Sequence, residues 1–157
     1  MDVTDNQWPS IEPAYAFVMP SYQLLTSRFE AADNRIGSLM TLASGLTLAA
    51  PAAARVVNPQ ITFDSRWFIG AISVFVLAMV CGLAARIRGD LILPNPRIIR
   101  ETALLKPEWK FKADALYISG QHFDDNARVI NIKGNWAIAL TVMLLIEVLL
   151  VVVWITG

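Results

Sequence analysis

The chain has 157 residues, of which 55% are apolar and 17% are charged, and its 13 basic and 13 acidic residues give a formal net charge of zero. This composition is typical of membrane proteins, and the neutral charge gives no reason to expect a nucleic-acid partner. The single cysteine, Cys81, excludes an intramolecular disulfide framework.

The first segment in chain order is an arm over residues 1–20. It contains Pro9, Pro13 and Pro20 together with acidic residues, and this composition predicts irregular structure. Ser21 follows the arm and can cap a helix. Beyond it, apolar residues recur at alternating spacings of three and four: Tyr22, Leu25, Phe29, Ala32, Ile36, Leu39 and Ala43. This spacing predicts one long helix that runs from the arm into the first apolar run.

Three apolar runs are long enough to cross the hydrocarbon core of a bilayer, which takes about 20 mostly apolar residues. They cover about residues 36–57, 67–85 and 136–155. Pro51 is expected to kink or shorten the first of them. Because irregular backbone cannot face lipid, all three runs are predicted to be helices. The predicted fold is an all-α integral membrane protein, with one helical membrane domain over residues 21–157.

The segment over residues 86–135 connects the second and third spans. Its first half is basic and is broken by Pro94, Pro96 and Pro107. In its second half, apolar or small residues again recur at spacings of three and four, and the pattern continues into the third span: Ala113, Leu116, Gly120, Phe123, Ala127, Ile130, Gly134, Ala137, Thr141, Leu144 and Val148. This pattern predicts a second long helix that passes from the segment into the membrane.

The basic residues are unevenly distributed between the two sides of the predicted spans. The arm and its helix carry two, the segment over residues 86–135 carries nine, and the loop between the first two spans carries Arg55 and Arg66. No basic residue follows the third span. The positive-inside rule therefore predicts a multi-pass membrane protein with a cytoplasmic N-terminus and a C-terminus on the opposite side of the membrane.

Glu147 is the one charged residue inside the third predicted span. It lies between Trp136 and Trp154, whose indole rings are expected at the membrane interfaces. A carboxylate near the bilayer centre costs about 2.5–3.5 kcal/mol on insertion scales, so the side chain is expected to face protein or water. Two interpretations follow: a gating or pore-lining residue, or a protonated group hydrogen-bonded across a helix interface.

Small residues recur every four positions in two of the predicted spans. Gly45, Ala49 and Ala53 form one such series, and Ala78 and Gly82 form another. This spacing lets helix backbones approach closely in membranes. It predicts either self-association or packing within one subunit.

Arg97 and Arg100 lie in the basic half of the connecting segment, with Trp109 and Tyr117 downstream. Arginines can hold a phosphate while an aromatic ring stacks on a base, so these four residues are the candidate site for a nucleotide. The alternative is that the charges set the topology and touch anionic lipid headgroups. His122 is the only histidine, and we predict no metal site, no cofactor and no enzyme activity.

The order of these parts resembles the transmembrane effectors of bacterial Pycsar antiphage systems and, more broadly, small SLATT-like membrane effectors with cytoplasmic helical extensions. The likeness rests on Asp33, Asn34 and Arg35, where the family has a similar Asp-Asn-Lys-like stretch, with arginine here in place of the more usual lysine. It also rests on the two-span hairpin and on residues 131–136 before the third span. It covers about residues 22–157.

The resemblance implies that a neighbouring cyclase makes a cyclic pyrimidine mononucleotide, cUMP or cCMP, after phage infection. The chain would bind this signal as a homo-oligomer and impair the inner membrane, which causes abortive infection. The residues alone leave two other functions open. One is a non-enzymatic accessory subunit of a larger membrane complex, and the other is a component of a transporter or proton pathway, suggested by Glu147.

Overall fold

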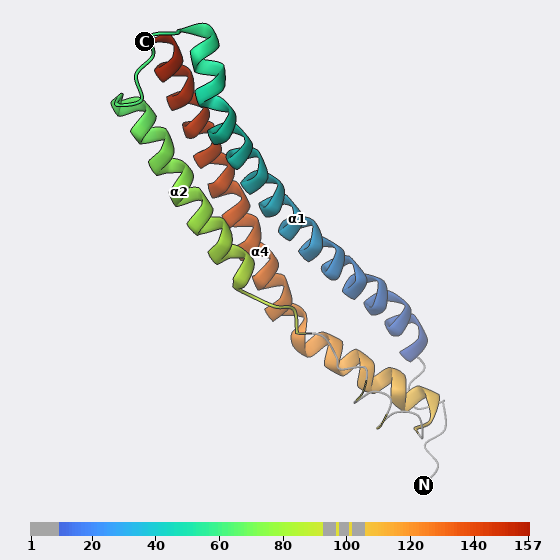
Figure 1. The fold of residues 1–157 in the computed structure, drawn as a ribbon. Helices are drawn as coiled ribbons and strands as arrows, with labels where there is room; N and C mark the ends of the chain where they lie inside the picture. The colour runs from blue at the N-terminus through green and yellow to red at the C-terminus, as the bar shows by residue number, and fades with distance from the viewer. Residues whose placement is uncertain (1–9, 93–96, 98–100, 102–105) are drawn as a thin grey trace. The chain divides into compact units, whose positions relative to one another are not determined.

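The computed structural model describes residues 10–92, 97, 101 and 106–157. Its helices are α1 (Ile11–Val57), α2 (Arg66–Ile87) and α4 (Glu108–Thr156), and the described residues contain no strand (Figure 1). Each of the three contains an apolar stretch long enough to cross a membrane. The prediction of an all-α membrane protein with three spanning helices is therefore confirmed.

The chain divides into two compact units. We call Glu30–Gly89 together with Asn131–Gly157 the membrane unit, and the described residues of Met1–Phe29 and Asp90–Ile130 the extension unit. With 47 and 49 residues, α1 and α4 are more than twice as long as a span requires, and each contributes to both units. The first and third spans therefore continue as helices, as predicted.

Helix α1 begins ten residues earlier than the predicted cap at Ser21. Pro13 lies in the first turn, where backbone amides have no partner inside the helix, so a proline is tolerated there. Pro20 removes one backbone hydrogen bond, yet the helix continues through it. The prediction of an irregular arm is thus wrong for residues 11–20, while residues 1–9 lie outside the described part of the chain.

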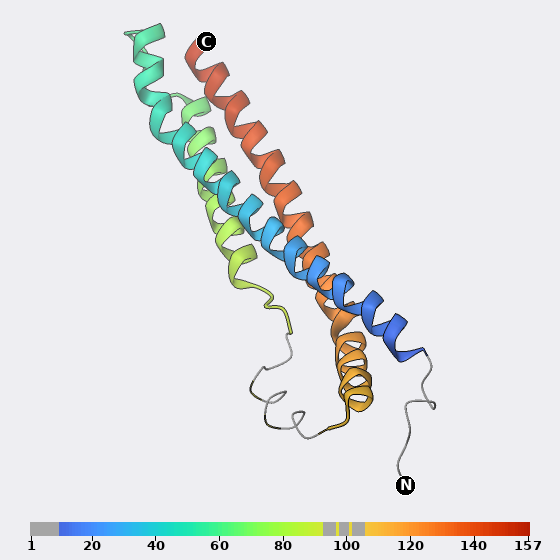
Figure 2. The same cartoon turned by 90° about the vertical axis from the view of Figure 1, so that its right-hand side faces the viewer.

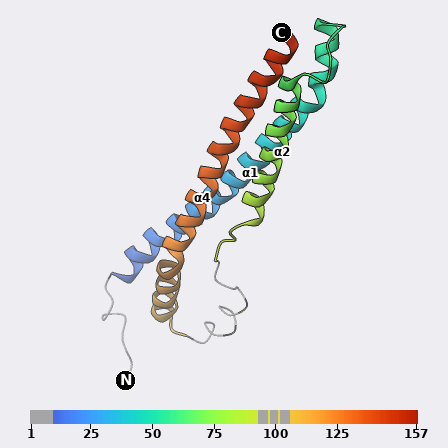
Figure 3. The ribbon, with the colours of Figure 1, turned by 90° about the vertical axis from the view of Figure 1, so that its left-hand side faces the viewer.

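The three helices of the membrane unit lie side by side (Figures 1 and 3). Small side chains form much of the contact between them. Buried alanines recur at seven-residue steps, with Ala43 and Ala50 on α1 and Ala71, Ala78 and Ala85 on α2, and Ala54 is buried one turn beyond Ala50. A seven-residue repeat keeps one seam of each helix facing its partners, and small side chains at that seam allow close approach in lipid.

The two predicted series of small residues have different environments. Gly82 and Ala78 are buried in α2, and Gly82 faces Met40 of α1. Gly45, Ala49 and Ala53 are exposed on the surface of the membrane unit. The first series therefore serves packing within one subunit, and the second is left without a partner among the described residues.

The buried face of α4 also repeats every seven residues, but most of its residues are polar. The buried positions at seven-residue steps, each at most 4% exposed, are Ser119, Asn126, Lys133, Leu140, Glu147 and Trp154, and Ala137 and Val151 are buried beside this series. The predicted apolar stripe of this helix is wrong at Gly120, Phe123 and Val148, which are exposed. The prediction took the interface of this helix to be apolar. In the structure, polar side chains of α4 also face the neighbouring elements and bond to them.

Trp154 differs from the expectation of an interfacial ring. It is buried among Phe63 and Phe68, with ring centroids 5.7 and 4.4 Å from its own, and its Nε1 donates a hydrogen bond to the Thr62 carbonyl at 3.0 Å. The indole therefore fixes the connection between α1 and α2, which lies at the same end of the membrane unit as the C-terminus (Figure 2).

The substitution Gly82→Leu should disrupt the packing of α2 against α1. A Cβ atom at position 82 would lie 2.6 Å from the Met40 sulfur, so a large side chain must displace that neighbour. We expect the free energy of unfolding to fall by about 1–3 kcal/mol. Gly134→Leu is the matched control, because a Cβ at position 134 meets nothing within 4 Å. Equal melting temperatures of the two variants in detergent would contradict this packing.

Candidate functional site

In the membrane unit, α1 and α4 run parallel with a constant offset between partners. The Lys133 ammonium donates to the Asp33 carboxylate, and the Thr47 hydroxyl donates to the Glu147 carboxyl. Both pairs join residues 100 positions apart. Because the two pairs also lie two seven-residue repeats apart, they occupy equivalent positions along the helix pair. The polar side chains of α4 at these two positions are therefore bonded to α1 residues with the same offset along the two helices.

Charges join all three membrane helices at the end of the unit where α1 and α4 continue into the extension unit. Lys133 Nζ on α4 lies 2.7 Å from Asp33 Oδ1 on α1, and Arg86 Nε on α2 lies 3.6 Å from Asp33 Oδ2. The Lys133 side chain is 3% exposed, whereas Asp33 and Arg86 are partly exposed. One carboxylate thus bridges two cations from different helices, and we call these three residues the Asp33 bridge.

An open groove of about 610 Å³ adjoins the Asp33 bridge. It is lined by Asp33, Asn34, Gly37, Ser38, Thr41, Leu42 and Arg86. Amide, hydroxyl and guanidinium groups therefore share one recess with an apolar wall. Two residues of the family-like stretch, Asp33 and Asn34, belong to it, while Arg35 is exposed outside its lining.

Glu147 is completely buried in the middle of the membrane unit. Its Oε1 accepts a hydrogen bond from the Thr47 hydroxyl at 2.5 Å, and its Oε2 has no hydrogen-bond partner among the described residues. Apolar clusters lie on either side along the bundle, one containing Ile36 and Leu140 and the other containing Trp154. The carboxyl therefore faces protein rather than lipid and forms a polar layer with Thr47.

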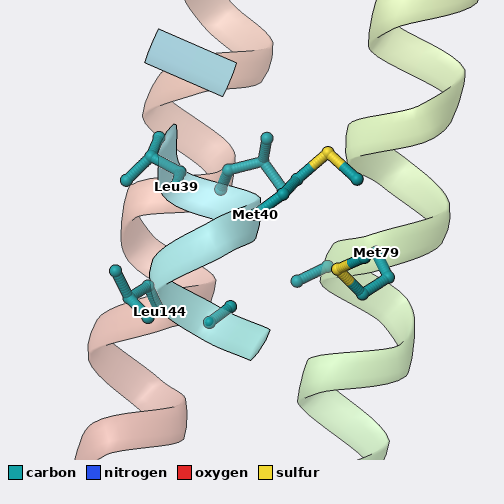
Figure 4. A pocket seen from close by; sticks show the side chains of 7 residues that line it. Leu39, Met40, Met79 and Leu144 are labelled. Carbon is teal, nitrogen blue, oxygen red and sulfur yellow. The ribbon is translucent and has the colours of Figure 1, made fainter. Parts of the chain in front are cut away.

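A small cavity lies in the contact between the three membrane helices. Its volume is about 10 Å³, and Leu39, Met40, Met79 and Leu144 are among the side chains around it (Figure 4). A void of this size with an apolar lining lacks the polar partners that a water molecule needs. The interior of one subunit therefore offers no room for a ligand at this level.

In the extension unit, Asn126 fixes the chain that follows α2. Its Oδ1 accepts from the Ile92 amide at 2.9 Å, and its Nδ2 donates to the Ile92 carbonyl at 3.2 Å. The Tyr22 hydroxyl donates to the same carbonyl at 2.8 Å. Burial raises the pKa of Tyr22, so the hydroxyl remains a donor at neutral pH. One buried amide and one phenol thereby connect α1, α4 and the linker.

Lys112 provides a second contact within the extension unit. It pairs with Glu108 on its own helix at 2.6 Å and with Glu12 of α1, again 100 positions away. Hydrogen bonds to Glu108 and Glu12 raise the pKa of Lys112, and the same contact lowers the pKa of Glu108. Because both carboxylates are exposed to water, these pairs contribute little to stability.

Of the residues predicted to hold a nucleotide, Arg97, Trp109 and Tyr117 do not line the groove or the cavity described above. Arg97 is exposed and pairs with Glu101 one helical turn away at 2.7 Å. Tyr117 is 73% exposed on α4, and Trp109 is half-buried near its start. Arg100 lies outside the described residues. Asp33 and Asn34 were singled out only as part of the family-like stretch, and the groove that they share with Arg86 was not predicted, since Arg86 lies far away in the sequence on α2.

Comparison with known proteins assigns no family: no protein-family model, no curated protein and no solved structure matches the chain. Within the described part of the chain, no three His, Cys, Asp or Glu side chains gather where they could hold a metal ion. The features available for a functional proposal are therefore the Asp33 bridge, its groove and the Glu147 layer.

Replacing Asp33 with asparagine should destabilise the membrane unit by about 1–3 kcal/mol, a value between those of buried and exposed ion pairs. The substitution removes the carboxylate that Lys133 and Arg86 share. Combining it with Lys133→Met should recover part of the loss, because the buried charge is then removed as well. Unfolding in detergent measures both effects.

Asp114→Asn is the matched control for this prediction. It makes the same change at the more exposed pair of Asp114 with Lys106, which lie 2.6 Å apart. We expect an effect of at most about 1 kcal/mol there. Equal losses in the two single variants would show that the Asp33 bridge is no stronger than a surface ion pair.

Proposed function

We propose that the chain is a non-enzymatic membrane effector of a bacterial antiphage defence system. It senses a cyclic pyrimidine mononucleotide, cUMP or cCMP, made by a neighbouring cyclase, and it impairs the integrity of the inner membrane so that the infected cell dies. The identity of the signal comes from the family resemblance. The observation that carries the proposal is the Asp33 bridge, in which a residue of the family-like stretch ties the three membrane helices together.

The Asp33 bridge is a suitable place for a signal to act on the membrane helices. Lys133 and Asp33 lie on helices that pass without a break from the membrane unit into the extension unit. A ligand that binds either unit can shift the arrangement of the bundle only if it binds the two arrangements with different affinity. The groove beside Arg86, which offers a guanidinium and hydroxyl groups, supports a phosphate contact there.

The effector is proposed to act as a homo-oligomer. Three spans are too few to enclose a pore easily, and the small cavity between the helices of one subunit is apolar and narrow. A path for ions therefore requires surfaces of several subunits or a disturbed bilayer. The exposed series Gly45, Ala49 and Ala53 supports contact between copies, because small residues at this spacing allow helices to approach closely.

The proposed orientation places the N-terminus and residues 86–135 in the cytoplasm and the C-terminus in the periplasm. Alkaline phosphatase folds into an active enzyme only outside the cytoplasm. It should be active when it is fused after Gly157 and inactive when it is fused before Met1. A fluorescent protein that matures only in the cytoplasm should give the reverse pattern at the same two positions. Phosphatase activity in the N-terminal fusion and not in the C-terminal fusion would show that the orientation is the reverse of the proposed one.

Expression together with a cyclase that makes cUMP or cCMP should depolarise bacterial cells, as measured with a potential-sensitive dye. Lys133→Met should abolish the depolarisation, because it breaks the Asp33 bridge. Lys110→Met is the matched control, since it removes one positive charge from an exposed position of the same helix. Membrane levels of each variant are compared by immunoblot. An unchanged potential in cells that hold ample cUMP and cCMP would count heavily against the proposal.

The exposed series on α1 also favours a second function, that of an accessory subunit in a larger membrane complex. Here Gly45, Ala49 and Ala53 would contact a helix of a different protein. Purification in mild detergent separates the two functions. Recovery of a different protein in fixed ratio supports the accessory subunit, and recovery of a homo-oligomer alone supports the effector.

A further inference from the structure

The layer of Glu147 and Thr47 lies apart from other charges, and the nearest basic residue along α1, Arg55, is eight residues beyond Thr47 and lies over the Phe63 ring. No other Asp, Glu, Lys, Arg or His occurs in residues 36–54, 67–85 or 134–157. The one thiol in these ranges, Cys81, packs against the cluster that contains Ile36 rather than the cluster beyond Glu147. No cation of the described bundle therefore compensates an ionised Glu147, although the side chain is completely buried.

The Thr47 hydroxyl bonds differently from other hydroxyls of the membrane helices. The usual pattern is donation to the carbonyl four residues earlier in the same helix, as in Thr41 to Gly37, Ser44 to Met40, Ser73 to Ile69 and Thr141 to Ala137. Thr47 instead reaches across to Glu147 Oε1 on α4. Its hydroxyl is therefore committed to the carboxyl group.

Pro51 leaves a second group of Thr47 without its normal partner. Proline has no backbone N–H, and Pro51 lies four residues after Thr47 inside α1, so the Thr47 carbonyl cannot accept the usual helical hydrogen bond. The residue that faces Glu147 thus carries a carbonyl without its usual helical donor. Glu147 Oε2 also has no donor among the described residues. The carboxyl oxygen and the carbonyl of the residue it contacts therefore both lack their usual donors.

We propose that this layer is a proton-binding site. Glu147 carries the proton on Oε2, the Thr47 hydroxyl donates to Oε1, and the Thr47 carbonyl freed by Pro51 accepts from the protonated carboxyl. A protonated carboxyl is both donor and acceptor, so it satisfies all the groups of the layer, whereas an ionised one is an acceptor only. Loss of the proton would leave an uncompensated charge between α1 and α4. The site does not depend on the proposed effector function.

Dicyclohexylcarbodiimide, an apolar reagent that requires a protonated carboxyl, tests the site in the full chain reconstituted in lipid vesicles. The carboxyl oxygen adds to the central carbon of the reagent while the proton moves to one nitrogen. An acyl shift from oxygen to nitrogen then gives a stable N-acylurea with no leaving group. Peptide mass spectrometry should locate the label on Glu147 at neutral pH, and Glu147→Gln should remove it.

Two variants should move the pH profile of labelling in opposite directions. Pro51→Ala restores an N–H to the Thr47 carbonyl and removes the acceptor, so labelling should be lost at a lower pH than in the wild type. Thr47→Val removes the donor to Oε1, which is the contact that favours the ionised form, so labelling should persist to a higher pH. Thr141→Val is the control with an unchanged profile, because its hydroxyl donates to the Ala137 carbonyl of its own helix.

Three results would overturn the proton-binding site. The first is the absence of label on Glu147 at neutral pH in protein whose helix content, measured by circular dichroism, is intact. The second is protection by sodium at constant pH and ionic strength, which would make the layer a cation site. The third is a shift of both variants in the same direction, which would indicate general loosening of the bundle. Thr47→Val keeps the side-chain shape, so it tests the site even where Pro51→Ala alters α1.

Discussion

A polar seam that repeats every seven residues along α4 holds the described helices in register. Between helices in lipid, apolar packing discriminates poorly among alternative arrangements, because the surroundings are as apolar as the side chains. Hydrogen bonds and ion pairs then determine which turn of one helix packs against which turn of its neighbour. A slip of one repeat would set Lys133 against Met40 and Glu147 against Ala54, leaving both polar groups without their partners. The seam therefore specifies one parallel alignment of α1 and α4, the role best established for buried polar groups.

The seam acts differently in the two units because their surroundings differ. In the membrane unit, Glu147 is sealed between apolar clusters, so a single hydrogen bond to Thr47 has few competitors. In the extension unit, Lys112 bonds to carboxylates that water also reaches, and the buried Asn126 carries most of the specificity by pairing with backbone groups of Ile92. The same spacing along one helix thus supports a proton-dependent contact in one unit and a fixed connection in the other.

Hydropathy predicted the three spans because a run of about 20 apolar residues rarely occurs outside a membrane helix. The position of Glu147 in a span predicted that it faces protein or water rather than lipid. The same emphasis on apolar residues missed Asn126 and Lys133, although both fall at seven-residue steps from Glu147. The prolines of the arm suggested a break that the backbone does not make at residues 11–20. The groove beside Arg86 depends on how α2 packs against α1, which local patterns do not contain.

The matched repeats of α1 and α4 also limit how this chain can vary in length. Inserting or deleting one residue in an α-helix turns everything beyond it by about 100°. Such a change in α4 between Asn126 and Glu147 would rotate one of these residues out of the interface while the other stayed in place. A change of seven residues in one helix keeps the same face inward but shifts the pairs by one repeat, so only equal changes in both helices keep the partners aligned. Related chains should therefore differ in length in the connection over residues 58–65 or between α2 and α4, and scarcely at all within the two long helices.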